Sequence, residues 1–321
     1  MSNNKRVVVA RLLLPAGRDL LEEKFDLVDG GLAATRDEVL ALVPGADALV
    51  ADPSVPVDEQ LLEAAGDQLA VVANYAVGFD NIDLAACHEH GVIVTNTPEV
   101  LTNATAELAV TLTLSAARNT SDAERRLRRG EWTGWDPADF IGFELSGATI
   151  GVAGMGRIGQ RYAELMSGFG GEILYTSREV KEGVEVKLGA RKVEFEKLLE
   201  ASDVVSLHLP SLPATRHIID AVALARMKSS AVLVNTGRGS LVDSEALAEA
   251  LESGTIGAAG LDVYENEPEV PRRLLEAPRT ALTPHIGSAT DRARDEMARL
   301  VALNVLAVLE GSAPPNPVSL E

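Results

Sequence analysis

The chain has 321 residues, of which 46% are hydrophobic and 24% charged, a length and composition that predict a globular protein of two domains. Its net charge of -19 argues against nucleic acids and anionic membranes as partners. The single cysteine, Cys87, excludes an intramolecular disulfide and is typical of the reducing cytoplasm, while secretory-signal and membrane-span patterns are absent from the sequence.

The N-terminal part of the chain alternates between short apolar strands and helices. Strands are expected at residues 5–10, 48–50, 69–73 and 92–94, and helices at 17–25, 61–65 and 84–90. Asp83 is the expected N-cap of the last of these helices. This alternation predicts a parallel sheet that is covered on both faces. The glycine-bearing loop 74–80 follows a strand, but by itself it is typical of an ordinary βα turn.

A long, mostly apolar helix is expected over residues 101–118. The loop that follows contains both tryptophans of the chain, Trp132 and Trp135. Aromatic side chains clustered in a loop indicate an interface or the wall of a pocket.

A glycine pattern lies near the middle of the chain, in Gly154-Met155-Gly156-Arg157-Ile158-Gly159. It follows an apolar strand and precedes a predicted helix at residues 160–169, which is the arrangement of a dinucleotide-binding turn. In that turn the first glycine allows the tight bend, the second lets the backbone approach a pyrophosphate, and the third lets helix and strand pack closely. Glycine-rich turns are common in proteins, so the segments on either side of this pattern decide its interpretation.

The sequence around this pattern predicts a complete doubly wound domain over residues 101–287. Six strands are expected at 149–153, 172–176, 203–209, 231–235, 258–263 and 280–282. A last helix, introduced by a capping box at 288–291, is predicted to run to about residue 310 and to return to the first domain. We therefore expect an α/β protein of two Rossmann-like parallel-sheet domains. The nucleotide-binding domain (101–287) would be inserted within a discontinuous, flavodoxin-like substrate domain (1–100 and 288–321).

Three polar residues follow neighbouring strands of the predicted second sheet. They are Arg238, Glu267 and His285, and each has an ordinary structural explanation when taken alone. Together they would lie at the sheet edge that also carries the glycine pattern, where they could bind a carboxylate substrate and transfer a proton. A nearby glutamate would favour the protonated form of the histidine. No metal site is expected, because the five histidines are scattered along the chain.

These motifs together resemble those of the D-isomer-specific 2-hydroxyacid dehydrogenases, and most closely those of the glyoxylate/hydroxypyruvate reductases. The resemblance covers essentially the whole chain, and its motifs occur at residues 74–83, 96–98, 154–159, 235–239, 260–268 and 284–290.

The resemblance implies a role for each candidate catalytic residue. His285 would protonate the carbonyl oxygen of a 2-keto acid, Glu267 would orient His285, and Arg238 would bind the substrate carboxylate. Backbone N–H groups of Val77 and Gly78 would bind the same carboxylate from the other domain. Hydride would pass from the nicotinamide to the keto carbon as the cleft closes and excludes water.

The resemblance also implies a set of residues that contact the cofactor. These are Thr105, Gly154, Gly156, Arg157, Ile158, Gly159, Ser177, Arg178, Leu209, Pro210, Thr215, Thr236, Gly237, Asp262 and Gly287.

The end of the second strand of this domain predicts which cofactor is used. NAD enzymes of this fold carry an acidic residue there, which binds the ribose 2′-hydroxyl group. Here Ser177 takes that place, and Arg178 and Lys181 are candidates to bind a 2′-phosphate. We therefore expect NADP(H) to be preferred over NAD(H), with Glu179 as the residue that argues against this preference.

The resembling enzymes are homodimers, and in animal members a loop tryptophan reaches the partner's active site. The spacing in the loop assigns that role to Trp135. Alternative functions are reduction of another substrate by the same family, of the D-lactate or D-3-phosphoglycerate type with NAD, and a nucleotide-sensing corepressor that binds proteins. Formate dehydrogenases have glutamine at the position of Glu267, which argues against that chemistry.

Overall fold

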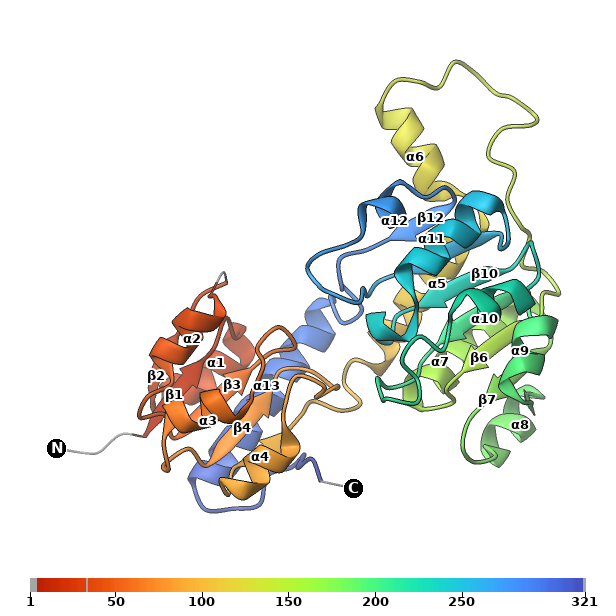
Figure 1. Cartoon of the computed structure of the whole chain (residues 1–321). Coiled ribbons are helices and arrows are strands. Elements are labelled where there is room, and N and C mark those ends of the chain that lie inside the picture. The colour runs from red at the N-terminus through yellow and green to blue at the C-terminus, as the bar shows by residue number, and fades with distance from the viewer. Residues whose placement is uncertain (1–4, 33, 320–321) are drawn as a thin grey trace. The chain divides into compact units, whose positions relative to one another are not determined.

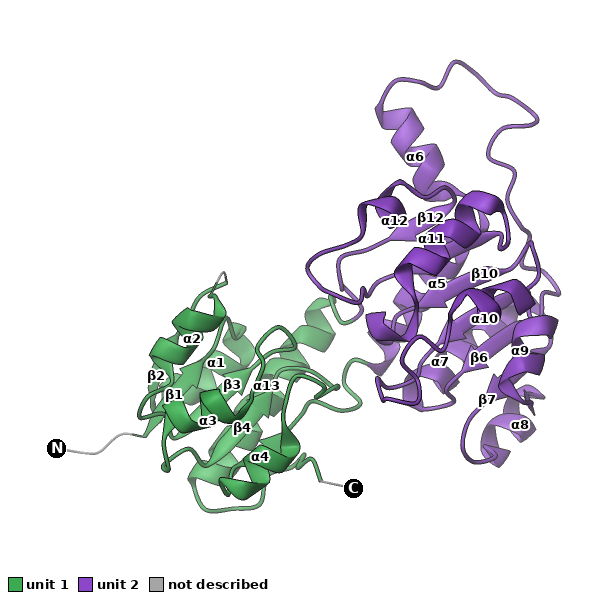
Figure 2. Ribbon diagram, viewed as in Figure 1, with its two compact units in different colours: residues 1–101, 288–321 green, residues 102–287 purple. Residues whose placement is uncertain are grey.

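The computed structural model describes residues 5–32 and 34–319, and the chain divides into two compact units. Unit 1 comprises residues 1–101 and 288–321, and unit 2 comprises residues 102–287. The N-terminal and C-terminal segments of the chain thus belong to the same unit, whose described residues are green in Figure 2, and the purple unit is formed by one continuous segment.

Unit 1 is built on a five-stranded parallel sheet in the order β2-β1-β3-β4-β5 (Figure 1). This is the flavodoxin-like order, in which ligands bind beyond the carboxyl ends of the strands. The strands are β1 (Arg6–Val9), β2 (Asp26–Asp29), β3 (Ala48–Ala51), β4 (Val71–Asn74) and β5 (Ile93–Thr95).

Helices cover the sheet of unit 1. The main hydrophobic cluster of unit 1 joins the strands to α2, α3 and α4. The C-terminal helix α13 packs against α1 and against β3, β4 and β5. The helices are α1 (Pro15–Glu22), α2 (Arg36–Leu42), α3 (Glu59–Ala65), α4 (Leu84–Glu89) and α13 (Asp291–Leu309). The C-terminal helix therefore completes the unit that the N-terminal residues begin.

Unit 2 is built on a seven-stranded parallel sheet in the order β12-β11-β10-β9-β6-β7-β8. The strand order reverses between β6 and β9, which are neighbours, and this is the switch point where doubly wound sheets bind nucleotides. The strands are β6 (Ile150–Ala153), β7 (Ile173–Thr176), β8 (Arg191–Lys192), β9 (Val204–Leu207), β10 (Val232–Asn235), β11 (Ala258–Leu261) and β12 (Thr280–Leu282).

Two hydrophobic layers cover the faces of this second sheet. One joins the strands to α5, α7 and α8, and the other joins them to α9, α10, α11 and α12. The helices of unit 2 are α5 (Thr102–Ala117), α6 (Thr120–Arg128), α7 (Arg157–Met166), α8 (Glu182–Leu188), α9 (Phe195–Ala201), α10 (Ala221–Arg226), α11 (Ser244–Ser253) and α12 (Arg272–Glu276). The predicted fold class, two parallel-sheet α/β domains, is confirmed.

Several element details differ from the sequence-based expectation. Strands β2 and β8 were not predicted, because both are edge strands whose residues are largely polar and lack a buried apolar run. The N-cap of α13 is Thr290, whose hydroxyl accepts a hydrogen bond from Ala293 N, and not Ser288. The predicted helix 160–169 begins earlier, at Arg157, because the third glycine of the pattern lies inside the first turn of α7. Helices α2, α8 and α10 were also not predicted.

Candidate active site

The glycine turn between β6 and α7 has the shape that an anionic ligand requires. Gly154 has a φ of 98°, and a Cβ there would lie 2.5 Å from the carbonyl oxygen of His208. A Cβ at Gly159 would collide with the carbonyl oxygen of Gly154. By contrast, a Cβ at Gly156 would meet no atom within 4 Å. Gly156 is the N-cap of α7, so the open space adjoins the positive end of a helix.

A buried, unsatisfied hydroxyl group lies at the same edge of the sheet. Thr236 follows β10, and its Oγ1 is buried without a hydrogen-bond partner among the described residues. Buried polar groups are normally hydrogen-bonded, so this atom indicates a place for a ligand. The glycine turn could hold the phosphates of a dinucleotide, and the Thr236 hydroxyl could hydrogen-bond to such a ligand.

The end of β7 has no carboxylate at position 177. The hydroxyl of Ser177 donates a hydrogen bond to the carbonyl oxygen of Glu179 at 2.5 Å. The Glu179 carboxylate lies 3.6 Å from Lys181 Nζ and its side chain is 83% exposed. Lys192 Nζ donates to the carbonyl oxygen of Arg178 at 3.2 Å. This surface therefore presents three cationic side chains and one paired carboxylate.

Arg238, Glu267 and His285 follow three adjacent strands of the second sheet. They come after β10, β11 and β12, whose carboxyl ends lie side by side. The turn that carries Arg238 is fixed by Asn235, whose Nδ2 donates to the carbonyl oxygen of Arg238 at 2.8 Å and whose Oδ1 accepts from Gly237 N at 3.0 Å. Asn235 is fully buried and was not singled out from the sequence, although an asparagine before a glycine-rich turn is a known turn signal.

His285 and Glu267 form the hydrogen bond that defines the site. His285 Nδ1 and Glu267 Oε2 are 2.6 Å apart, and Glu267 Oε1 accepts from Tyr264 N at 2.9 Å. Burial raises the pKa of Glu267, but the hydrogen bonds from His285 and Tyr264 and the charges of His285 and Arg238 outweigh it. The net pKa of Glu267 lies below its usual value, so it is a carboxylate at neutral pH.

Asp262 holds the loop that presents His285. Its Oδ1 accepts from Thr283 Oγ1 at 2.6 Å and from Ile286 N at 2.8 Å, and its Oδ2 accepts from Gly287 N at 2.8 Å. His285 itself has a left-handed φ of 54°, which costs free energy in a non-glycine residue and persists only when the surroundings fix it. Asp262 is 1% exposed, and burial raises its pKa despite these hydrogen bonds. The structure thus gives Asp262 a positioning role that the sequence did not suggest.

The other predicted cofactor residues lie around the same edge of unit 2. Thr105 on α5 adjoins Gly287, since a Cβ on that glycine would lie 3.5 Å from Thr105 Cγ2. Leu209 lies next to Gly154, where an added Cβ would be 3.1 Å from Leu209 Cδ2. The hydroxyl of Thr215 is already engaged, because it donates to the carbonyl oxygen of Pro210 at 2.7 Å. In this structure the Thr215 side chain therefore stabilises the loop of residues 210–215.

The two tryptophans lie on an extended loop after α6 and are not covered by the described residues of the chain. Trp132 is 56% exposed and Trp135 84% exposed. The base of the loop is fixed by Arg126, which forms two hydrogen bonds with Asp139 and lies 5.2 Å from the ring centroid of Phe140. Trp135 is therefore largely uncovered by the described residues of this chain.

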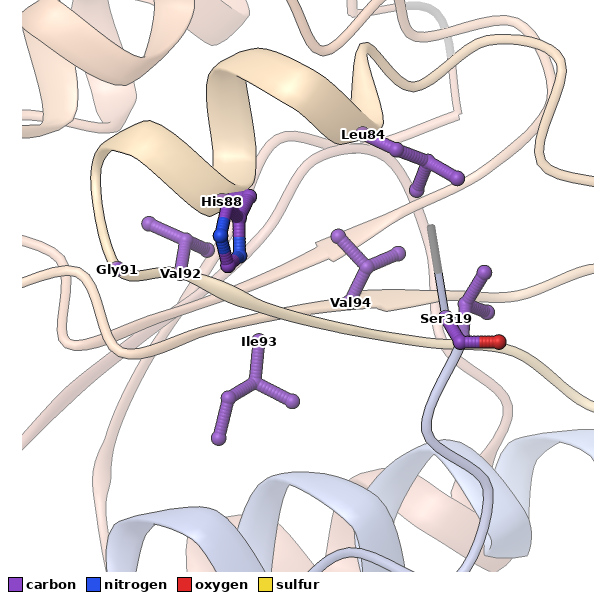
Figure 3. Close-up of a pocket in the computed structure, with 8 residues that line it drawn as sticks. Leu84, His88, Gly91, Val92, Ile93, Val94 and Ser319 are labelled. Atoms are coloured by element: carbon purple, nitrogen blue, oxygen red, sulfur yellow. The ribbon is translucent and has the colours of Figure 1, made fainter. Parts of the chain in front are cut away.

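A pocket in unit 1 does not have the character of an active site. Figure 3 shows Leu84 and His88 of α4 facing β5, with Val92 and Val94 on the helix side of the strand and Ile93 on the other side. The lining is mostly apolar and lies at the amino end of β5, whereas parallel sheets bind ligands at the carboxyl ends. We therefore assign no catalytic role to this pocket.

Neither a metal centre nor a membrane segment is found in the described parts of the chain. Residues 5–32 and 34–319 contain no group of three or more His, Cys, Asp or Glu side chains that could hold a metal ion. Among the helices of these residues, none has both the length and the apolar character needed to cross a membrane.

Comparison with known proteins gives consistent matches over the whole length. Residues 110–287 match the family described as D-isomer specific 2-hydroxyacid dehydrogenase, NAD binding domain. The chain is similar to the glyoxylate reductase of Thermococcus litoralis, with 44% identity over 320 residues, covering 98% of this chain and 96% of the relative.

Solved structures are similar over the same extent. A protein of Thermus thermophilus has a TM-score of 0.91 and 41% identity, covering 98% of this chain and 100% of that one. An NADPH-dependent glyoxylate/hydroxypyruvate reductase of Sinorhizobium meliloti, in complex with NADP and malonate, has a TM-score of 0.88 and 34% identity, covering 99% and 97%.

Proposed function

Because the chain belongs to the D-isomer-specific 2-hydroxyacid dehydrogenase family, we propose that it reduces a small 2-keto acid, glyoxylate or hydroxypyruvate, with NADPH. The observation that carries this proposal is the 2.6 Å hydrogen bond between His285 and Glu267, at the sheet edge that also holds Arg238 and the glycine turn. The names of the similar proteins, glyoxylate reductases and a glyoxylate/hydroxypyruvate reductase, support the choice of substrate.

In this proposal the residues of unit 2 bind the substrate and move the proton. The cofactor supplies a hydride to the keto carbon. His285 uses Nδ1 to bind the ionised Glu267, which leaves Nε2 to donate a proton to the carbonyl oxygen. Arg238 binds the substrate carboxylate through its guanidinium group. One hydride and one proton convert the keto acid to the hydroxy acid, and His285 then regains a proton from solvent.

A spectrophotometric assay tests the proposed function directly. Oxidation of NADPH should depend on glyoxylate or hydroxypyruvate, and the 2-hydroxy acid should form in equal amount. A strong preference for pyruvate or 3-phosphohydroxypyruvate would move the protein to another branch of the family. If the enzyme oxidised neither NADPH nor NADH with any 2-keto acid, a nucleotide-sensing binding protein would be the better explanation.

The preference for NADPH is proposed from the residues that follow β7. Ser177 leaves no carboxylate for a ribose 2′-hydroxyl group, and the exposed Arg178 is a candidate to contact a 2′-phosphate. Replacing Arg178 with alanine is expected to raise KM for NADPH by roughly tenfold or more, the cost of one charge-assisted hydrogen bond, while KM for NADH stays unchanged.

Arg191→Ala provides the matched control for this variant. Arg191 lies on the neighbouring strand β8 and pairs with Glu172, so its removal also deletes one cation from the surface of unit 2. We expect no change in either cofactor's KM for this control. A wild-type kcat/KM for NADH equal to that for NADPH would show that the proposed preference is wrong.

We further propose that the protein is a homodimer in which Trp135 reaches the partner's active site. The 84% exposure of Trp135 on a loop held by Arg126 supports this proposal. Trp135→Ala is expected to raise KM for the keto acid about fivefold, the loss of one aromatic contact, whereas Trp132→Ala in the same loop should have a smaller effect. An unchanged substrate preference and KM in Trp135→Ala would refute the role of Trp135 in the partner's active site. Analytical ultracentrifugation would measure whether the protein is a dimer.

A further inference from the structure

The loop that follows β4 in unit 1 has three consecutive carbonyl groups that are all hydrogen-bonded. The carbonyl oxygen of Ala76 accepts from Thr97 N at 2.9 Å. That of Val77 accepts from Asn96 Nδ2 at 2.8 Å, and that of Gly78 accepts from Asn74 Nδ2 at 2.7 Å. The backbone from residue 76 to residue 79 is therefore held by one main-chain N–H and two side-chain amides.

This arrangement determines where the next three N–H groups point. The peptide bonds of this loop are trans. In a trans peptide the N–H points away from the C=O of the same unit. The N–H groups of Val77, Gly78 and Phe79 thus point away from the groups that bind the preceding carbonyls. In the described part of the chain, none of these three N–H groups has a main-chain acceptor.

Three successive N–H groups without a main-chain acceptor among the described residues give the loop a positive partial charge, which favours an anion. Val77 and Gly78 are partly buried, and backbone N–H groups in such positions are normally paired, so a ligand that accepts hydrogen bonds would satisfy them. The loop also lies at the carboxyl end of β4, the position at which flavodoxin-like sheets bind ligands.

The amide of Asn74 is itself fixed by a second asparagine. Asn74 is fully buried, and its Nδ2 also lies 3.1 Å from Asn81 Oδ1. Asn81 Nδ2 donates to the carbonyl oxygens of Asp52 and Val55, each at 3.0 Å. These bonds determine which atom of each amide is the donor, so Asn74 can only present N–H to Gly78.

We propose that Asn96 and Asn74 are positioning residues that hold the N–H groups of Gly78 and Phe79 in place for the substrate carboxylate, with Phe79 N–H as an additional donor. The proposal rests on the proposed function and on the carboxylate contact that the family resemblance implies for the N–H groups of Val77 and Gly78. Without Asn96 the Val77 carbonyl would be free to rotate, and the Gly78 N–H would rotate with it.

The test uses Asn96→Ala, because Asn96 is only partly buried whereas Asn74 is buried. Loss of the Asn96 side chain should therefore disturb folding less than loss of the Asn74 side chain. KM for glyoxylate is expected to rise about tenfold, with kcat changed less than threefold and KM for NADPH unchanged. Asn96→Asp keeps the shape but cannot donate when ionised, so it should be at least as impaired. Asn74→Ala should show the same rise in KM for glyoxylate. Its melting temperature is measured first, to show that the variant is folded.

Gln68→Ala is the matched control. Gln68 is another amide side chain of unit 1 that donates to main-chain carbonyls, those of Ala46 and Ala65, but it lies before β4 rather than after it. This variant should retain the wild-type KM for glyoxylate. If Asn96→Ala and Gln68→Ala behave alike, the positioning role is overturned.

Calorimetric titration with oxalate separates this inference from the proposed function. Wild-type protein is expected to bind oxalate about tenfold more tightly than Asn96→Ala, and this measurement does not need turnover. If wild-type protein bound oxalate in this way but reduced no 2-keto acid, the proposed function would fail and the anion site would stand. Equal oxalate affinity in an active wild-type enzyme and in Asn96→Ala, or no oxalate binding to wild type at all, would overturn the inference.

Discussion

Replacing His285 with asparagine is expected to lower kcat for 2-keto acid reduction by about a thousandfold, within the usual contribution of general acid catalysis. The carbonyl oxygen would then have to take its proton from water, without an aligned donor. Asparagine also tolerates the left-handed φ of 54° found at this position better than most residues, so the loop should keep its shape. KM for NADPH should change little, because the glycine turn and β7 are untouched. Steady-state kinetics with glyoxylate would measure both quantities.

His90→Asn is the matched control for this variant. His90 also pairs with a glutamate, since its Nε2 lies 2.8 Å from Glu59 Oε1, but the pair lies on the surface of unit 1. Loss of this ring should leave kcat unchanged. A His285→Asn enzyme that keeps more than about a tenth of wild-type kcat would contradict the assignment of His285 as the proton donor.

Replacing Glu267 with glutamine is expected to lower kcat about a hundredfold and to shift the pH dependence. The pKa of Glu267 is below its usual value, so wild-type enzyme has a negative charge beside His285 at neutral pH. Protonation of Glu267 would remove this charge, so wild-type activity should fall as the pH drops through the lowered pKa of this carboxyl group. Glutamine does not titrate, so Glu267→Gln should lack this acid limb.

The profile of kcat/KM against pH would measure this shift. Glutamine still offers an oxygen to Tyr264 N, so the turn that carries residue 267 should persist. Glu59→Gln, at the surface pair with His90, should leave the profile unchanged. If Glu267→Gln keeps the same acid limb as wild type, Glu267 has no electrostatic role in the reaction.

The fold class could be predicted because its signals are local. Apolar strands such as β6 and β10 are buried on both faces, and the glycine turn after β6 requires a left-handed φ at Gly154. Edge strands such as β2 and β8 could not be predicted, since solvent on one side removes the apolar run that marks a strand. These strands form because a neighbouring strand offers hydrogen bonds, and the local sequence contains no signal of that neighbour.

The sequence could predict the edge of the sheet at which the candidate site lies, but not the contacts within the site. Parallel strands end on one side, so residues that follow β10, β11 and β12 had to lie near each other. Which of these side chains would touch was beyond the sequence. The 2.6 Å contact joins residues 267 and 285, and it depends on the turn closed by Tyr264 N and on the loop held by Asp262.

The sequence by itself determined the two α/β sheets, the position of the glycine turn and the residues at the strand ends, because hydrophobic period and glycine placement act within a few residues. Only the tertiary structure decided that Asp262 fixes the His285 loop and that Asn74 and Asn96 hold the carbonyls of residues 77 and 78. These roles are hydrogen bonds between segments far apart in the chain or across a loop. An asparagine or aspartate has the same local propensity whether or not such a partner exists. Its role therefore depends on the tertiary structure that brings the partner within hydrogen-bonding distance.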